Sequence, residues 1–325
     1  MKVQTATIII ILLILIGIVG YLLFNRIKAY FGKLIENPEG FQNKNVLTID
    51  DPDKFYDQYY VDRIDMAYYP QNKNICRCAK LYKQAFHGVF PKNQTKILMV
   101  GSQTGRFLDA LCGTSPNVTA LTNQKLLKKK AQHNAPSSNV IFGDILTNPK
   151  LFPHNTFTHI VFEEREYYTY TREQRKIALE HCKKWLRQEG ILAIRSLDPE
   201  KFDPMIPTAV PLSGINIQNY IKDRKLDSQV RFIDGSKIIT HYTPIPSEHK
   251  AVFREDLYDT MGEHLRTHIH RWYMPPRDVI LEETMSLGFS HKDTITLNDC
   301  TFPGEYYEIF VNGTPKLLTK SESSD

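Results

Sequence analysis

The chain has 325 residues, of which 42% are hydrophobic and 24% are charged. These proportions are typical of a globular protein, and they exclude a disordered chain, a collagen-like chain and a membrane protein with many spans. The net charge of +5 favours an anionic neighbour such as a membrane surface without indicating specific binding to nucleic acid, and the five cysteines are expected to be reduced thiols.

Residues 1–26 are predicted to form a retained transmembrane anchor. The stretch Ala6–Phe24 contains 19 residues and no charged side chain. As a helix it would span roughly 28 Å, close to the bilayer's hydrocarbon thickness of about 30 Å. A cleaved signal peptide would have a shorter apolar region and a small-residue cleavage site. Because Arg26, Lys28 and Lys33 outnumber Lys2, the positive-inside rule favours a single-pass protein with a cytosolic body.

The remainder is predicted to divide into a juxtamembrane linker (27–50), a folded domain (51–319) and a disordered tail (320–325). Two helices are expected first, at Asp53–Ile64 and Ile75–Phe86. From Lys96 onward, short apolar runs alternate with amphipathic ones, the pattern of parallel strands joined by helices. The expected strands are Lys96–Val100, Val118–Leu121, Asn139–Phe142, Thr158–Phe162 and Ile191–Arg195. The expected helices between them are Arg106–Cys112, Gln124–His133 and Arg172–Arg187.

The first of these strands leads into a loop that contains Gly101 and Gly105. Glycines at a strand-to-helix turn let a ligand approach the backbone, and the N-terminus of the following helix faces it. A dinucleotide-binding fingerprint would need a third glycine and an acid after the second strand, and a P-loop would need a lysine after the second glycine. The chain has neither, which argues against a nicotinamide-dependent oxidoreductase and a P-loop nucleotidase.

A long insert, about 198–272, precedes the last expected helix. Three of its segments alternate apolar and polar residues like antiparallel strands: Ser236–Thr243, Ala251–Tyr258 and His264–Trp272. His268 and His270 fall on one face of the third segment. With His241 or His264 they could bind a metal, but no cysteine or carboxylate stands at a supporting spacing. We therefore predict a polar strand face and no metal, with His270 as a candidate general base.

The stretch from Lys96 to Gly313 resembles the class I S-adenosylmethionine-dependent methyltransferases. Successive segments are similar to the family's first motif, its third and fourth strands and its turn into the fifth: Lys96–Gly105, Asn139–Asp144, Thr156–Val161 and Trp185–Ile194. Tyr273–Phe289 resembles its last helix, with final strands at Lys292–Leu297 and Tyr306–Val311. The anchor, the aromatic segment Phe55–Tyr60 and the Asn-, Lys- and Ile-rich composition also resemble membrane-anchored methyltransferase-like proteins of large DNA viruses.

The resemblance implies an α/β, Rossmann-like fold with a seven-stranded sheet in the order 3-2-1-4-5-7-6, the seventh strand antiparallel, and an antiparallel β insert. It implies S-adenosyl-L-methionine as cofactor, bound by Gly101, Ser102, Gly105, Thr122, Asn123, Asp144 and Ile145. The family usually supplies carboxylates at the first strand, after the second for the ribose and after the third for the adenine. Here Met99 and Thr122 occupy the first two positions, and only Asp144 matches. Losing a charge-assisted carboxylate–diol pair would cost on the order of 1–3 kcal/mol of binding.

The segment after the fourth strand, Phe162–Tyr170, is expected to face the transferred methyl group, because ligands bind at the carboxyl ends of strands in an open α/β sheet. Glu163 and Glu164 are candidates to accept a proton, and Tyr167 is a candidate to contact the sulfonium by its ring. A solvated charged turn with packed tyrosines is the alternative. Two functions stay open: an active methyltransferase with an unidentified acceptor, and a catalytically degenerate protein of this fold with a binding or structural role at a membrane or in a virion.

Overall fold

The computed structural model describes residues 46–68, 90–112, 117–163, 165–202, 204–206, 208–212, 225–297 and 304–313. The predicted anchor at 1–26, the predicted helix Ile75–Phe86, the candidate residue Glu164 and the predicted tail lie outside these residues. Among the helices of the described ranges, none is long and apolar enough to cross a bilayer.

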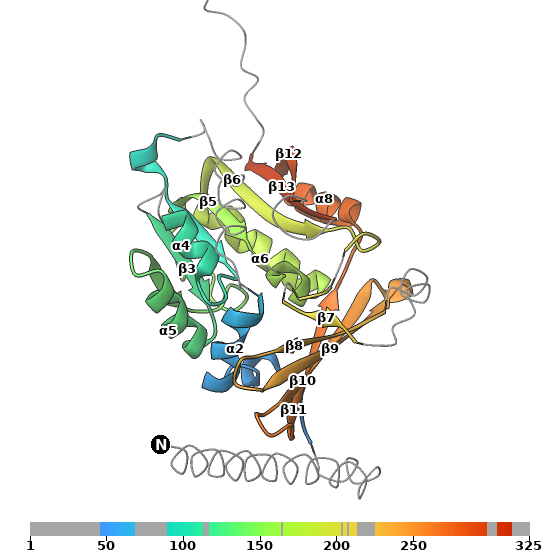
Figure 1. Ribbon diagram of the computed structural model, residues 1–325. Coiled ribbons are helices and arrows are strands. Elements are labelled where there is room, and N and C mark those ends of the chain that lie inside the picture. Colours follow the sequence, from blue (N-terminus) through green and yellow to red (C-terminus); the bar gives the residue numbers. More distant parts are fainter. Residues whose placement is uncertain are drawn as a thin grey trace, which may run out of the picture. The chain divides into compact units, whose positions relative to one another are not determined.

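A mixed seven-stranded sheet forms the centre of the fold (Figure 1). Its strands are β2 (Ile97–Val100), β3 (Val118–Thr122), β4 (Asn139–Phe142), β5 (Phe157–Phe162), β6 (Leu186–Leu197), β12 (Phe289–Thr296) and β13 (Glu305–Asn312). They follow the order β12-β13-β6-β5-β2-β3-β4. The first five are parallel, and β13 lies antiparallel between β6 and β12. The predicted order 3-2-1-4-5-7-6 and the antiparallel seventh strand are therefore confirmed.

Helices cover both faces of this sheet: α4 (Arg106–Cys112), α5 (Lys125–Asn134), α6 (Arg172–Trp185) and α8 (Arg277–Ser286). Successive residues of β2 point to opposite faces, so Ile97 and Met99 pack with α4 and α5 while Leu98 and Val100 share a core with α6 and α8. All four residues of β2 are buried, which explains its continuous apolar sequence. A capping box at Thr171 starts α6 at the predicted residue.

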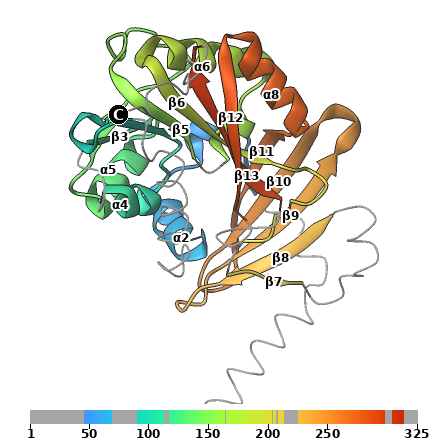
Figure 2. The same ribbon diagram turned by 90° about the horizontal axis from the view of Figure 1, so that it is seen from above.

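A second, six-stranded sheet is built mainly from the insert (Figure 2). Its order is β1-β11-β10-β9-β8-β7, with bounds β1 (Leu47–Ile49), β7 (Val210–Pro211), β8 (Leu226–Arg231), β9 (Lys237–Ile245), β10 (Lys250–Tyr258) and β11 (His264–Tyr273). The three predicted insert strands are β9, β10 and β11, whereas β7 and β8 were not predicted. β1 pairs parallel with β11. Strand β1 thus lies inside the range 27–50 that was predicted as linker.

Helix α2 (Gln58–Tyr68) packs against α5 and against the second sheet. It begins five residues after the predicted start at Asp53, because Pro52–Lys54 forms a separate 3-10 turn. The carboxylate of Asp57 then accepts a hydrogen bond from the backbone N–H of Tyr60 at 2.8 Å, which caps the first turn of α2. The other short 3-10 turns are Lys92–Gln94, Glu166–Thr169 and Pro246–Glu248.

Candidate functional site

A cavity of about 350 Å³ lies at the carboxyl ends of β2, β3, β4 and β5. This volume is within the range of roughly 300–1,000 Å³ that is usual for small-molecule sites. Three parts of the chain form its wall. The strand-end loops contribute Gly101, Ser102, Thr122, Asn123, Gln124, Asp144, Ile145, Arg165, Glu166 and Tyr170. The α2 region contributes Asp51, Asp53, Tyr56, Tyr60 and Tyr68, and the second sheet contributes Phe253, His270 and Trp272.

Gly105 is the one predicted cofactor residue that does not line the cavity; the other six do. It has a φ of +83°, and a Cβ on it would lie 2.7 Å from Cα of Ala131. Gly105 therefore permits the close approach of the first loop to helix α5. The sequence placed this glycine in the correct loop but assigned it to ligand contact instead of helix packing.

The first loop supplies a polar group to the cavity through Ser102. This residue is 4% exposed, and in the described part of the chain its hydroxyl has no hydrogen-bond partner. Leaving a buried hydroxyl unpaired costs about 1–3 kcal/mol. A polar ligand in the cavity would satisfy it, so the loop fits a cofactor with hydrogen-bonding groups.

A carboxylate stands near the end of β3 although the sequence after that strand has none. Asp53, in the 3-10 turn before α2, accepts a hydrogen bond of 2.7 Å from the side-chain amide of Gln124, two residues beyond Thr122. At the end of β4, the backbone N–H of Leu146 donates to the carboxylate of Asp144 at 2.8 Å and so orients it. The cavity thus has carboxylates beside both strand ends. The sequence missed Asp53 because it comes from a separate segment.

The carboxyl group of Glu166 also faces the cavity. The hydroxyl of Tyr170 donates a hydrogen bond to it at 2.7 Å. Burial raises the pKa of Glu166; the hydrogen bond from Tyr170 opposes that rise, and the nearby carboxylate of Asp144 adds to it. Gly101 makes this placement possible, since a Cβ there would lie 2.6 Å from Cβ of Glu166.

Two of the candidate catalytic residues, Glu163 and Tyr167, lie in the core and not at the cavity, contrary to expectation. Glu163 is 1% exposed, pairs with Arg195 at 2.8 Å and accepts a hydrogen bond from the hydroxyl of Tyr307. Tyr167 is 1% exposed and packs edge-on against Phe162, and burial raises the pKa of its hydroxyl. The structure therefore places Glu163 in a buried ion pair and Tyr167 in the aromatic core. The cavity-lining members of this segment are instead Arg165, Glu166, Thr169 and Tyr170.

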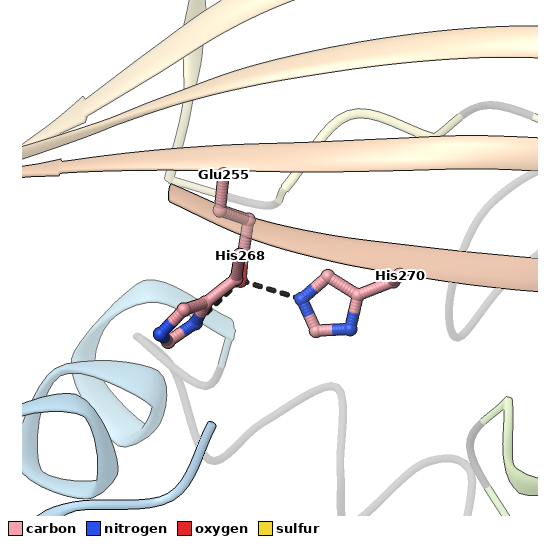
Figure 3. A group of neighbouring side chains, drawn as sticks. All are labelled: Glu255, His268 and His270. Carbon is pink, nitrogen blue, oxygen red and sulfur yellow. Dashed lines mark hydrogen bonds and ion pairs between the residues drawn. The ribbon is translucent and has the colours of Figure 1, made fainter. Parts of the chain in front are cut away.

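The candidate His270 does line the cavity, and it belongs to a cluster with Glu255 and His268 (Figure 3). The carboxylate of Glu255 accepts hydrogen bonds from His270 at 2.8 Å, from the hydroxyl of Tyr68 at 3.2 Å and from the hydroxyl of Tyr60. Burial by itself would raise the pKa of Glu255, but His270 and His268 outweigh burial and lower it.

The prediction that no carboxylate supports the histidine pair is therefore wrong. Glu255 lies on β10, directly opposite His268 on β11. His241 and His264, which the sequence offered as further ligands, instead approach Asp256 at 3.3 Å and 3.4 Å.

The wall on the side of the second sheet is aromatic. The rings of Phe253 and Trp272 stack with centroids 5.0 Å apart. The guanidinium of Arg165 lies 4.9 Å from the ring centroid of Trp272 and 5.0 Å from that of Phe202. This wall combines flat apolar surfaces with one cation, which suits a small molecule that carries an anionic or electron-rich group.

No protein-family model matches the sequence, and no curated protein matches it either. Solved structures do match. The CcbJ methyltransferase from Streptomyces caelestis aligns with a TM-score of 0.59 and 10% identity, over 78% of this chain and 96% of that one. A sugar N-methyltransferase from Streptoalloteichus sp. gives 0.58 and 14%, over 84% and 98%. An amino pentose methyltransferase from Micromonospora echinaspora, solved with bound S-adenosylmethionine, gives 0.55 and 16%, over 78% and 97%. The described chain therefore has the fold of the class I S-adenosylmethionine-dependent methyltransferases.

Proposed function

We propose that the protein is an S-adenosylmethionine-dependent methyltransferase that acts on a small molecule. One observation carries the proposal: six residues expected to bind the cofactor, from three separate strand-end loops, line a single cavity. The unpaired hydroxyl of Ser102 points to a polar occupant of that cavity.

Different residues of the cavity would bind different parts of the cofactor. Asp144 and Ile145 would hold the adenine, and Asp53 would bind the ribose hydroxyls together with Thr122 and Asn123. Ser102 would bind the amino-acid part, and the carboxyl group of Glu166 would face the positive sulfonium. When bound, the cofactor supplies an activated methyl group. The chain's own contribution is to orient it and to close the cavity from water with Tyr56 and Tyr60 of the α2 region.

The acceptor would lie against the aromatic wall of the second sheet, near Arg165 and Trp272. An anionic group on the acceptor would pair with the guanidinium of Arg165, and a flat apolar part would stack on the rings. The sugar and amino pentose methyltransferases of the same fold act on small molecules, which supports this size class.

We further propose that residues 1–26 anchor the enzyme to a membrane by a single helix, with the folded domain in the cytosol. The absence of any charged side chain from Ala6 to Phe24 supports this location. The alternative function is that of a degenerate protein which keeps the fold and no longer binds the cofactor. The replacement of the family's ribose carboxylate by Thr122 favours that alternative, and the position of Asp53 opposes it.

Calorimetric titration of the full chain in detergent with S-adenosylhomocysteine tests the proposal. Saturable binding is expected, and Asp53→Asn and Asp144→Asn should each weaken it by about 1–2 kcal/mol, or roughly 5- to 30-fold, through loss of a charge-assisted hydrogen bond. Asp62→Asn is the matched control, because Asp62 lies on α2 outside the cavity and bonds to Gln58. A folded wild-type chain that does not bind would establish the degenerate alternative.

A further inference from the structure

Two histidines and one glutamate converge at the edge of the cavity, on one face of the second sheet (Figure 3). His268 and His270 are alternate residues of β11, and Glu255 of β10 is the cross-strand partner of His268. Alternate residues of a strand share a face, so all three side chains project to the same side. A nitrogen of each imidazole and a carboxylate oxygen lie within 4.8 Å of one another. Two paired strands hold this arrangement, which makes it well defined.

His268 is the member of the cluster whose polar atoms are least satisfied. Its side chain is 0% exposed, and across the described residues neither ring nitrogen has a hydrogen-bond partner. The carboxylate of Glu255 is 3.8 Å from Nδ1, beyond hydrogen-bonding distance. The ring stacks on Phe55 at 4.9 Å and meets Tyr60 edge-on at 4.5 Å. Burying an imidazole without a hydrogen-bond partner costs about 1–3 kcal/mol of folding free energy. A metal ion that accepts the lone pair of one ring nitrogen would offset this cost.

We propose that Glu255, His268 and His270 bind a divalent transition-metal ion of the zinc class. Two imidazoles with one carboxylate form the protein ligand set of catalytic zinc sites, and the same set binds non-haem Fe²⁺. In a tetrahedral site with bonds of about 2.0–2.1 Å, ligand atoms lie roughly 3.3 Å apart. Here the oxygen of Glu255 is 2.8 Å from the nitrogen of His270 and 3.8 Å from that of His268. The three ligand atoms lie within 4.8 Å of one another, so the two imidazole nitrogens would have to approach each other by at most about 1.5 Å to reach the tetrahedral spacing.

The surroundings of the cluster have the features of a metal site. The hydroxyls of Tyr60 and Tyr68 donate to Glu255, which orients the carboxylate as outer partners of metal ligands do. Phe55 covers both imidazoles, with its ring centroid 4.5 Å from that of His270. The chain supplies three ligands, and His270, Tyr60 and Tyr68 line the cavity. A fourth coordination position would therefore face the cavity, where an oxygen or nitrogen of a small molecule can occupy it.

The proposal that an ion binds here is argued from this geometry alone. The further proposal that the ion holds the methyl acceptor rests on the proposed function. At that position the ion would lower the pKa of an acceptor hydroxyl or amine and orient it toward the rest of the cavity. The competing interpretation is a metal-free imidazole–carboxylate pair in which Glu255 only orients His270.

Metal titration of the untagged, chelator-treated full chain separates these interpretations. Zn²⁺ should bind with a stoichiometry of one per chain, and Glu255→Gln and His268→Ala should each weaken binding by about 100-fold, because each removes one of three protein ligands. His264→Ala is the matched control, since His264 lies on the same strand but approaches Asp256 instead. Circular dichroism and the thermal midpoint show that each variant is folded. Parallel titration with Fe²⁺ under nitrogen identifies the preferred ion.

X-ray absorption at the metal edge should show a first shell of nitrogen and oxygen only. The metal site is refuted if the wild-type chain does not bind either ion stoichiometrically, or if folded His268→Ala binds as tightly as wild type. Because binding of S-adenosylhomocysteine is measured separately, failure of the metal proposal leaves the methyltransferase proposal testable, and the reverse also holds.

Discussion

Replacing Gly105 by alanine should destabilise the fold more than replacing Gly262, although both glycines have nearly the same backbone conformation. Their φ angles are +83° and +84°. An alanine at positive φ costs about 1–2 kcal/mol. At Gly262, in the turn between β10 and β11, the new methyl group would have nothing within 4 Å. Gly262→Ala should therefore lower the free energy of unfolding by about 1–2 kcal/mol, from backbone strain alone.

At Gly105 the methyl group would lie 2.7 Å from Cα and 2.9 Å from the carbonyl oxygen of Ala131, both backbone atoms of α5. A backbone cannot rotate away as a side chain can, so the helix must shift. Overpacking of this kind typically adds about 1–3 kcal/mol. Gly105→Ala should then cost about 2–5 kcal/mol in total. The gain from a less flexible unfolded chain is the same in both variants and cancels in the comparison.

Differential scanning calorimetry of the two variants measures this difference. For a domain of this size, 1 kcal/mol shifts the thermal midpoint by roughly 2–4 °C, so Gly105→Ala should melt roughly 2–12 °C below Gly262→Ala. Equal midpoints would refute the steric argument. A Gly105→Ala chain with an unchanged midpoint and weakened S-adenosylhomocysteine binding would instead restore the sequence's assignment of Gly105 to the ligand.

Two further predictions concern the anchor and the pH dependence of stability. Full-length protein should resist carbonate extraction while a chain beginning at Gly40 is released. Asn93, Asn117 and Asn312 each begin an N-x-T sequence, the acceptor for glycosylation in the lumen, so their glycosylation in cells would contradict the cytosolic orientation. The ion pair of Asp256 and His241 should stabilise the second sheet most between about pH 4 and 6.5. Burial acts to raise the pKa of Asp256, but hydrogen bonds from His241 and Thr267 outweigh burial and lower this pKa to about 2. The stabilisation that the Asp256 carboxylate provides is therefore present above about pH 3.8 and is lost as the pH falls toward 2. Hydrogen bonding to Asp256 raises the pKa of His241. The stabilisation that protonated His241 provides is therefore fully present below about pH 6.5 and is lost as the pH rises further. His241→Asn should flatten the thermal midpoint against pH above 6.5, and an unchanged profile would show that the pair is not coupled to folding.

The inner strands of the central sheet could be predicted from the sequence because they are buried on both faces. A strand such as β2, with all four residues buried, has a continuous apolar sequence that marks it as a strand. β6 is longer than predicted, Leu186–Leu197 instead of Ile191–Arg195, because its partners β5 and β13 extend the pairing past polar residues. Strand length there depends on the partner strand, which local sequence does not encode.

The cofactor loops could be placed by their resemblance, whereas the groups that complete the cavity could not. Asp53 reaches it from before α2, and Glu255 reaches His268 only through the register of two strands. The position of Glu255 could have been found from the sequence. Gly262 marks a turn between two expected strands, and pairing these strands residue by residue outward from the turn would have placed Glu255 near the histidines. The misplacement of Glu163 has a similar cause. Strand alternation continues past Phe162, so Glu163 shares the face of Val161 and turns toward Arg195 on β6.

Three of the four carboxyl groups that line the cavity offer a test that separates an active site from a degenerate one. Asp53, Asp144 and Glu166 face the same volume. Burial is the main cause of the raised pKa of Glu166, and repulsion from the carboxylate of Asp144 raises this pKa further. A cavity with only a structural role gains nothing from such repulsion, whereas a bound cation relieves it. S-adenosylmethionine carries a positive sulfonium and S-adenosylhomocysteine a neutral sulfide. Glu166→Gln should therefore weaken binding of S-adenosylmethionine several-fold more than binding of S-adenosylhomocysteine, in calorimetric titrations above pH 7. The same variant should also raise the thermal midpoint of the ligand-free chain, because one like charge is removed from the cavity. Equal loss of affinity for both ligands would mean that Glu166 does not sense the sulfonium.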